Sequence, residues 1–170
     1  ITLLIADTLR KKENEEHRND FLRILSKIET IASLHRHLYK NKNKNEIALK
    51  DYLTEIKNNF NEIADDKNVA LTFTIDDFKI ESENAMYLGL LITELIINSI
   101  KYAFTETQQK IITTTITKET QGYSFKYQDN GKTSIDENIQ PKLIHQLCLQ
   151  LEVHYTINTS NGFQLTFVKK

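Results

Sequence analysis

The 170-residue sequence predicts an α+β fold, in which a helical hairpin precedes a mixed β-sheet covered by helices on one face. Three observations lead to this prediction. Apolar residues recur at helical spacing near the N-terminus, a mostly apolar helix lies in the middle of the chain, and segments of alternating polarity follow residue 68. We place the boundary between residues 1–45, the hairpin with a linker, and residues 46–170, the sheet domain.

The hairpin is predicted from two apolar stripes. Residues 1–12 are apolar at one helical face and begin without a cap, which indicates a helix that starts upstream of Ile1. Residues 14–20 are charged and are expected to form the turn, and a long amphipathic helix continues to Tyr39. The polar run 40–45 is expected to be a linker. Because such hairpins commonly pair into four-helix bundles, a homodimer is expected.

The remaining elements follow from the period of the apolar residues. Helical spacing predicts helices at 49–64, 88–104 and 141–151, and alternation predicts strands at 69–75, 110–117, 123–127, 154–159 and 162–168. In the helix at 49–64 the residues expected to face inward are Tyr52, Leu53, Ile56, Phe60 and Ile63. This order of elements gives helices on one face of a mixed sheet.

Composition excludes several classes of function. A formal net charge of −1 provides no field that would favour nucleic acid or an anionic membrane surface. No apolar run approaches the roughly 20 residues that span a bilayer, and no signal peptide is recognisable. The lone Cys148 lies between two leucines and is expected to be a packed thiol in a reducing compartment. Since the chain begins at Ile1, a longer protein is expected.

The helix at 88–104 carries the polar residues of greatest interest. Glu94, Asn98 and Lys101 are spaced i, i+4 and i+7, which places a carboxylate, an amide and an ammonium on one face of an apolar helix. Such groups are costly to bury without a partner, and a hydrated divalent cation that bridges to a phosphate would satisfy them. The alternative is a position at the rim, where water and the three groups satisfy one another.

This segment, LGLLITELIINSIKYAF, resembles the N box of the histidine-kinase ATPase superfamily, which has the Bergerat or GHKL fold. It is most similar to sensor histidine kinases whose phosphoacceptor helix carries an HHRVKNN-type motif. Other parts of the chain resemble the same family in the expected order: IASLHRHLY at 31–39, LKDYLTEI at 49–56, YQDNG at 127–131 and NGFQLTF at 161–167. The resemblance implies a dimerisation segment at 1–45 and an ATPase domain at 46–170.

The resemblance also implies roles for individual residues. Asn98 would hold Mg²⁺, Glu94 would be the base or polarising group, and Lys101 would contact phosphate. Asp129 and Gly131 would open the glycine box that reads adenine, and Tyr102 would line the nucleotide pocket. The cofactors implied are ATP and Mg²⁺. The partners implied are a second copy, through the hairpin, and a response-regulator receiver domain, in a cytoplasmic protein or the cytoplasmic part of a membrane-anchored sensor.

Two of these assignments have structural alternatives. Asp129 precedes Asn130 and Gly131, and Asp-Asn-Gly is also favourable turn chemistry. Tyr102 follows the N box and is equally compatible with core packing.

The chain departs from the family at the phosphate end of the site. Thr133 replaces the second glycine of the box, no glycine lies between Gly131 and Gly162, and the short lid carries Asp136 and Glu137. Because glycines let backbone amides approach a triphosphate, these changes remove the usual phosphate cradle. A nucleotide-free histidine phosphotransferase or adaptor is therefore the alternative function. A serine kinase of the same superfamily is a third hypothesis, which the hairpin makes less favoured.

The histidines are expected to have structural roles. The phosphoacceptor is expected upstream of Ile1, and His17 is expected at the turn of the hairpin rather than as the acceptor. His35 and His37 lie near the end of the second helix, where a cation interacts favourably with the last carbonyls. His145 and His154 are expected at the surface or the sheet edge.

Overall fold

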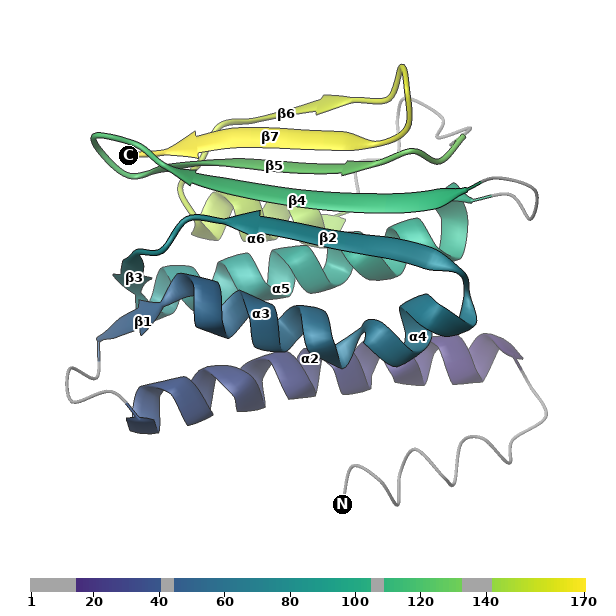
Figure 1. Cartoon of the computed structure of the whole chain (residues 1–170), viewed down its shortest axis with the longest axis horizontal. Coiled ribbons are helices and arrows are strands. Elements are labelled where there is room, and N and C mark those ends of the chain that lie inside the picture. The colour runs from purple at the N-terminus through teal and green to yellow at the C-terminus, as the bar shows by residue number, and fades with distance from the viewer. Residues whose placement is uncertain (1–14, 41–44, 105–108, 133–141) are drawn as a thin grey trace.

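A computed structural model describes residues 15–40, 45–104, 109–132 and 142–170, with the side chains of the first helix described from 24 to 39 (Figure 1). The helix expected at 1–12, most of the linker and the lid residues Thr133, Asp136 and Glu137 lie outside the described residues.

The sheet of the protein is mixed, as the sequence predicts. It has five strands in the order β2-β4-β5-β7-β6. β2 pairs with β4 in parallel and the other neighbours are antiparallel. The strands are β2 (Val69–Ile75), β4 (Lys110–Lys118), β5 (Tyr123–Asp129), β6 (Tyr155–Asn158) and β7 (Gln164–Lys169). Figure 1 shows that the described helices lie on one face of this sheet, so the predicted α+β sandwich is confirmed.

The helices form two levels beneath the sheet (Figure 1). The elements in chain order are α2 (Glu15–Lys40), α3 (Leu49–Asn59), α4 (Asn61–Asp66), α5 (Ser82–Asn98), the π-helix η1 (Ser99–Ala103) and α6 (Lys142–Gln150). The largest fully buried side chains include Tyr52, Phe60, Phe125 and Tyr127, from the helices and from the sheet. Helix α2 contacts α5 and α3 on their side away from the sheet.

The structure corrects three details of the predicted elements. Helix α2 begins at Glu15, inside the expected turn, because this stretch has no glycine or proline and opens with two glutamates, which favour a helix N-terminus. His17 therefore lies in the first turn of α2. The helix expected at 49–64 is interrupted at Phe60, so Ala64 is buried and Ile63 only half-buried.

A small two-stranded sheet is absent from the sequence prediction. β1 (Glu46–Ala48) pairs antiparallel with β3 (Lys79–Glu81). Three residues are too few to show a reliable alternation of polarity, so this pairing becomes visible only in the fold. It fixes the start of α3 next to the start of α5, and the Leu49 amide donates to the Phe78 carbonyl at 3.0 Å.

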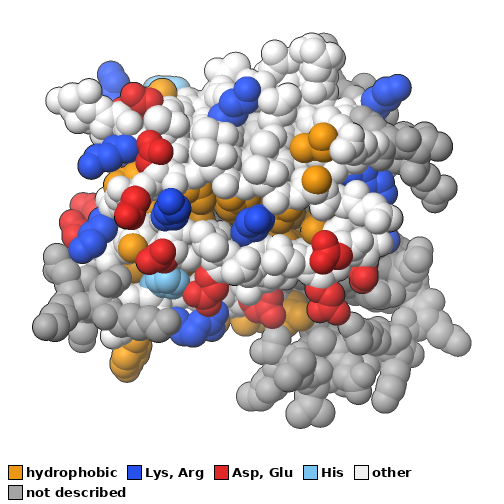
Figure 2. Space-filling model, in the orientation of Figure 1, with side chains coloured by type: hydrophobic (Ala, Val, Ile, Leu, Met, Phe, Trp, Pro, Cys, Tyr) orange, Lys and Arg blue, Asp and Glu red, His pale blue; other side chains and the backbone are white. Residues whose placement is uncertain are grey.

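The surface on the side of α3 and α4 carries acidic and basic side chains that are interspersed (Figure 2). This distribution agrees with the formal net charge of −1. Among the described residues no helix is both long enough and apolar enough to cross a membrane.

Candidate functional site

Helix α5 places the predicted site residues. Its segment 88–97 is buried on nearly every side, and Gly89 allows α3 to pack closely, because a Cβ there would lie 2.2 Å from the Tyr52 hydroxyl. After Asn98 the helix widens into the π-helix η1, a distortion that is frequent at functional sites. Glu94 is buried, Asn98 and Lys101 are half-buried, and Tyr102 is exposed.

Asp129 lies at the end of β5 and is almost completely buried, with an exposed fraction of 1%. One carboxylate oxygen, Oδ1, accepts hydrogen bonds from the backbone amides of Gly131 at 2.9 Å and Phe163 at 3.1 Å. The other oxygen, Oδ2, accepts a hydrogen bond from the Ser99 hydroxyl at 2.5 Å. The carboxylate is therefore bound to the N box, to its own turn and to the chain entering β7.

Tyr127 extends this network. Its side chain is fully buried, and its hydroxyl lies 2.8 Å from the Ser99 oxygen. Burial raises the pKa of the Tyr127 phenol well above its ordinary value, and the nearby Asp129 charge raises this pKa further, against the opposite effect of the Ser99 hydrogen bond. The phenol is thus a hydroxyl group, and not a phenolate, throughout the physiological pH range.

Two glycines allow this close approach of segments. A Cβ on Gly131 would lie 2.3 Å from the Ala103 carbonyl oxygen, so the segment after Asp129 fits against η1 only without a side chain. Gly162 has φ of +87°, and a Cβ there would lie 2.1 Å from the Asp129 carbonyl oxygen. Asn130 points the other way: its side-chain oxygen accepts from the Ile111 amide at 2.8 Å and anchors the start of β4.

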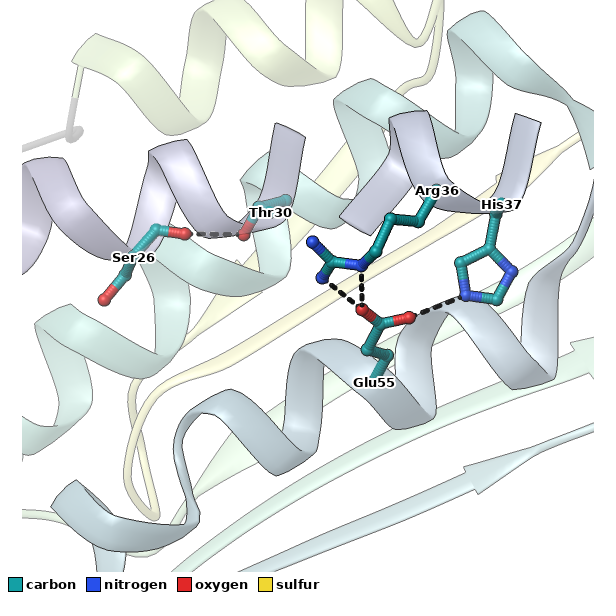
Figure 3. Close-up of polar contacts among 5 residues, drawn as sticks. All are labelled: Ser26, Thr30, Arg36, His37 and Glu55. Carbon is teal, nitrogen blue, oxygen red and sulfur yellow. Dashed lines mark hydrogen bonds and ion pairs between the residues drawn. The ribbon is translucent and has the colours of Figure 1, made fainter. Parts of the chain in front are cut away.

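Glu94 faces helix α2 and not Asp129. Its carboxylate has an exposed fraction of 1% and lies 2.9 Å from the Lys27 ammonium. One residue away, the hydroxyls of Thr93 and Thr30 lie 2.8 Å apart, and the Thr30 hydroxyl donates to the Ser26 carbonyl (Figure 3). Polar contacts thus dock α2 over the middle of α5, and the candidate base is covered and ion-paired.

Helix α2 is also held by α3. Glu55 accepts hydrogen bonds from the Arg36 guanidinium, and its other oxygen lies 2.9 Å from His37 Nε2 (Figure 3). Partial burial by itself raises the pKa of Glu55, but the hydrogen bonds from Arg36 and His37 outweigh it and lower this pKa. His37 therefore contacts α3 as well, and its expected interaction with the end of its own helix stays a prediction.

The structure brings together some of the predicted site residues. Asp129 and Gly131 lie against the end of the N box, where Ser99 and Ala103 contact them. Glu94 points toward Lys27, although its spacing relative to Asn98 suggested one shared face. Tyr102 has an exposed fraction of 69%, so it is not packed in the core.

Sequence reasoning missed two polar residues of these networks. Ser99 directly follows the predicted metal ligand, and a hydroxyl in so apolar a helix was a signal that could have been followed. Lys27 interrupts the apolar stripe of α2, but its partner could be identified only once the helices were packed.

Other candidates have structural roles. Cys148 is buried, which raises the pKa of its thiol to about 11, as expected for a packed residue. His145 Nδ1 lies 3.0 Å from the Tyr155 hydroxyl, and His154 is exposed. Within the part of the chain that the structure describes, no three histidine, cysteine or acidic side chains form a group that could hold a metal.

Comparison with known proteins gives independent evidence. Residues 1–64 match the family model HisKA_2, described as histidine kinase. A search of curated proteins found no match.

Three solved structures illustrate the likeness of the fold. The histidine kinase domain of the blue-light activated kinase EL346 from Erythrobacter litoralis superposes with a TM-score of 0.75 at 16% identity, covering 86% of this chain and 74% of that one. Histidine kinase AdeS of Acinetobacter baumannii gives 0.58 at 13% identity, over 99% and 95% of the two chains. The cytoplasmic segment of histidine kinase QseC gives 0.57 at 17%, over 89% and 94%. The chain spans 59% of the longer EL346 protein.

Together these findings define the class of protein. The mixed sheet with helices on one face has the fold of histidine kinase domains. Its N-terminal part, residues 1–64, matches the histidine kinase family HisKA_2 in the region where the resemblance placed the dimerisation helix. The family match over residues 1–64 and the likeness of fold agree with the resemblance to histidine kinases. The boundary at residue 45 stays a prediction, and α2 packs directly on the helices beyond it.

Proposed function

We propose that the chain is the core of a two-component sensor histidine kinase that transfers phosphoryl from ATP to a histidine and then to a response-regulator aspartate. The observation that carries the proposal is the junction of Asp129 and Gly131 with the end of the N box, through Ser99 and Ala103. Ser99 and Asp129 are 30 residues apart in the sequence. In the family that the chain resembles, both segments would bind the same nucleotide.

The adenine end of the site fits a nucleotide. Asp129 is a buried carboxylate that accepts three hydrogen bonds from the described residues, which leaves it the capacity to accept one more, such as that of the adenine amine. Gly131 lies in the same turn, and exposed Tyr102 is on the adjoining η1, where its ring is accessible to a base. We assign adenine recognition to Asp129, with Gly131 and Tyr102 in contact with the nucleotide.

The phosphate end is assigned to the N box. Asn98, whose amide oxygen is a hard ligand, would hold Mg²⁺, and Lys101 would contact phosphate. When bound, Mg²⁺ supplies neutralisation of the phosphate charge. Glu94 would orient the acceptor imidazole and take its proton, which requires that α2 no longer pair Lys27 with this carboxylate.

A second function is favoured by one specific observation. The Lys27–Glu94 ion pair covers the candidate base, and the sequence has no glycine between Gly131 and Gly162 to form a phosphate cradle. A histidine phosphotransferase or adaptor that docks a partner without nucleotide would keep the fold. It would need neither an accessible base at Glu94 nor a glycine-rich phosphate cradle.

The proposed partners are a second copy of the chain and a receiver domain. Ile24, Ile28 and Ile31 are exposed by 55%, 55% and 40%, and their spacing forms an apolar stripe on α2 that suits a helical bundle between two copies. The phosphoacceptor histidine would lie upstream of Ile1, and the site would face the cytoplasm.

The decisive experiment is calorimetric titration of the chain with a non-hydrolysable ATP analogue, with and without Mg²⁺. Micromolar binding that strengthens with Mg²⁺ supports the kinase, and absence of heat at millimolar nucleotide supports the adaptor. Asn98→Ala is expected to remove the Mg²⁺-dependent part of the affinity. Asn84→Ala, a half-buried asparagine at the other end of the same helix, is the matched control.

A further inference from the structure

The hydrogen bonds that reach Asp129 run in one direction. The Ser99 hydroxyl has one proton, and this proton is donated to Asp129 Oδ2 at 2.5 Å, a length typical of a charge-assisted hydrogen bond. The Ser99 oxygen, 2.8 Å from Tyr127, must then accept the proton of the phenol. The chain of donors is therefore Tyr127 to Ser99 to Asp129.

The strand geometry supports this direction. Tyr127 and Asp129 are two residues apart on β5, so both side chains project to the same, buried face of the sheet. Burial, the largest cause, raises the pKa of the Tyr127 phenol well above its ordinary value and keeps its proton available for Ser99. The neutral phenol oxygen is a weaker acceptor than the charged Asp129 carboxylate, so the Ser99 proton is directed to Asp129.

Among the described residues, the hydrogen bonds to Asp129 leave one lone-pair position of its carboxylate without a donor. A carboxylate offers about four lone-pair positions. Three of them accept the hydrogen bonds from Gly131, Phe163 and Ser99. The remaining position is on Oδ2, the oxygen that Ser99 holds. A ligand at this position must donate a proton, since a carboxylate oxygen repels another acceptor.

We propose that Ser99 is a specificity-determining positioning residue, whose hydroxyl fixes Asp129 Oδ2 so that the site accepts a purine with an exocyclic amine and rejects one with a carbonyl oxygen at the same position. Tyr127 supports it by directing the Ser99 proton. This inference rests on the proposed nucleotide-binding function and adds to it the residue that sets the choice of base.

The test compares ADP with IDP by calorimetry on the whole chain. The two bases differ at C6, an amine in ADP and a carbonyl in IDP, and in the hydrogen that IDP carries on N1. Wild-type protein is expected to prefer ADP. Ser99→Ala should lower the ratio of ADP to IDP affinity about tenfold, the worth of one hydrogen bond to a charged group, mainly by weakening ADP. Ser99→Thr keeps a hydroxyl and should restore the ratio. Tyr127→Phe should lower the ratio about threefold, because Ser99 keeps its own bond to Asp129.

Two buried hydroxyls that have no hydrogen-bond partner among the described residues provide matched controls. Tyr123→Phe removes a phenol hydroxyl from the same strand, and Thr114→Val removes a hydroxyl at the position that pairs with Tyr127 in β4. Neither change should alter the ratio.

Three results would overturn the inference. The first is an unchanged ratio in Ser99→Ala, and the second is an equal loss of ADP and IDP affinity together with a lower melting temperature, which indicates a purely structural role. The third is no binding of either nucleotide to wild-type protein. This last result contradicts the proposed function itself, whereas the first two contradict only the role of Ser99.

Discussion

Two carboxylates of this protein, Asp129 and Glu94, are equally buried, with exposed fractions of 1%, but their hydrogen-bond and charge partners differ. Asp129 is held by neutral donors from its own turn, from η1 and from the chain entering β7. Glu94 is neutralised by an ammonium from α2, a helix on the other side of the predicted domain boundary. Neutral donors fix a carboxylate and leave its charge in place, whereas an ammonium cancels that charge.

This difference separates the residue proposed to recognise the nucleotide, Asp129, from the residue proposed to react, Glu94. Among the described residues, the hydrogen-bond donors to Asp129 come from Ser99, Gly131 and Phe163, and α2 supplies none of them. If Glu94 is the base, as proposed, its availability would depend on the position of α2, because Lys27 of that helix forms an ion pair with it. In the proposed kinase, nucleotide binding at Asp129 therefore does not require α2 to move, whereas phosphoryl transfer through Glu94 does.

The largest expected effect comes from removing the ion pair between Lys27 and Glu94. Lys27→Met keeps the apolar stem of the side chain but deprives a carboxylate exposed by 1% of its ammonium. We expect a loss of about 3 kcal/mol in the free energy of unfolding, near the lower limit for a broken buried ion pair because Lys27 is 26% exposed. Urea denaturation measures this loss.

A double-mutant cycle tests the cause. Glu94→Gln in the Lys27→Met background should recover more than half of the loss, since a neutral amide no longer requires the ammonium. Lys50→Met, an exposed lysine on α3, is the control and should change stability little. If Lys27→Met costs the same in the wild-type and in the Glu94→Gln backgrounds, Lys27 acts through packing and not through charge.

A substitution next to Asp129, Gly131→Ala, is expected to lower the free energy of unfolding by a smaller amount. In Gly131→Ala the new Cβ would meet the Ala103 carbonyl oxygen at 2.3 Å and the Ala103 Cβ at 2.5 Å. Neither atom is the end of a flexible side chain, so η1 and the turn after Asp129 must separate. We expect a loss of about 2 kcal/mol, typical of overpacking, and weaker nucleotide binding than in the wild type.

Thermal melting with and without ADP measures both effects of Gly131→Ala. Ala103→Gly removes one of the two opposing atoms, and in combination with Gly131→Ala it should recover part of the binding. Unchanged binding in Gly131→Ala would separate Gly131 from the nucleotide site.

The sequence predicted the fold better than it predicted the contacts of the site. β2 was predicted at its observed bounds because its alternation is regular over seven residues. β1 and β3 were missed because three residues hold too little periodic information. The N box and Asp129 were found by motif, and their side-by-side placement agrees with the prediction.

The contacts of Glu94 could not be predicted in the same way. Spacing along one helix defines a face, but the neighbour on that face is set by packing of distant segments. Lys27 and Glu94 are far apart in sequence, and the π-helix after Asn98 changes the phase of the residues that follow. For this reason spacing grouped Glu94 with Lys101 and missed both Lys27 and Ser99.

The smallest expected effect concerns the second contact that holds α2, at Glu55. Partial burial by itself would raise the pKa of Glu55, but hydrogen bonds from Arg36 and His37 outweigh it and hold this pKa below its ordinary value in the folded state. Stability from this carboxylate is therefore present above the unfolded pKa and is lost as the pH falls through the lower, folded pKa.

Glu55→Gln should lower the melting temperature slightly near neutral pH and flatten the decline of the melting temperature below about pH 4.3. Glu119→Gln, in the turn after β4, should retain the wild-type decline. An equally steep decline in Glu55→Gln would show that α2 stays docked on α3 without this charge, and that Lys27 alone makes the docking of α2 depend on charge.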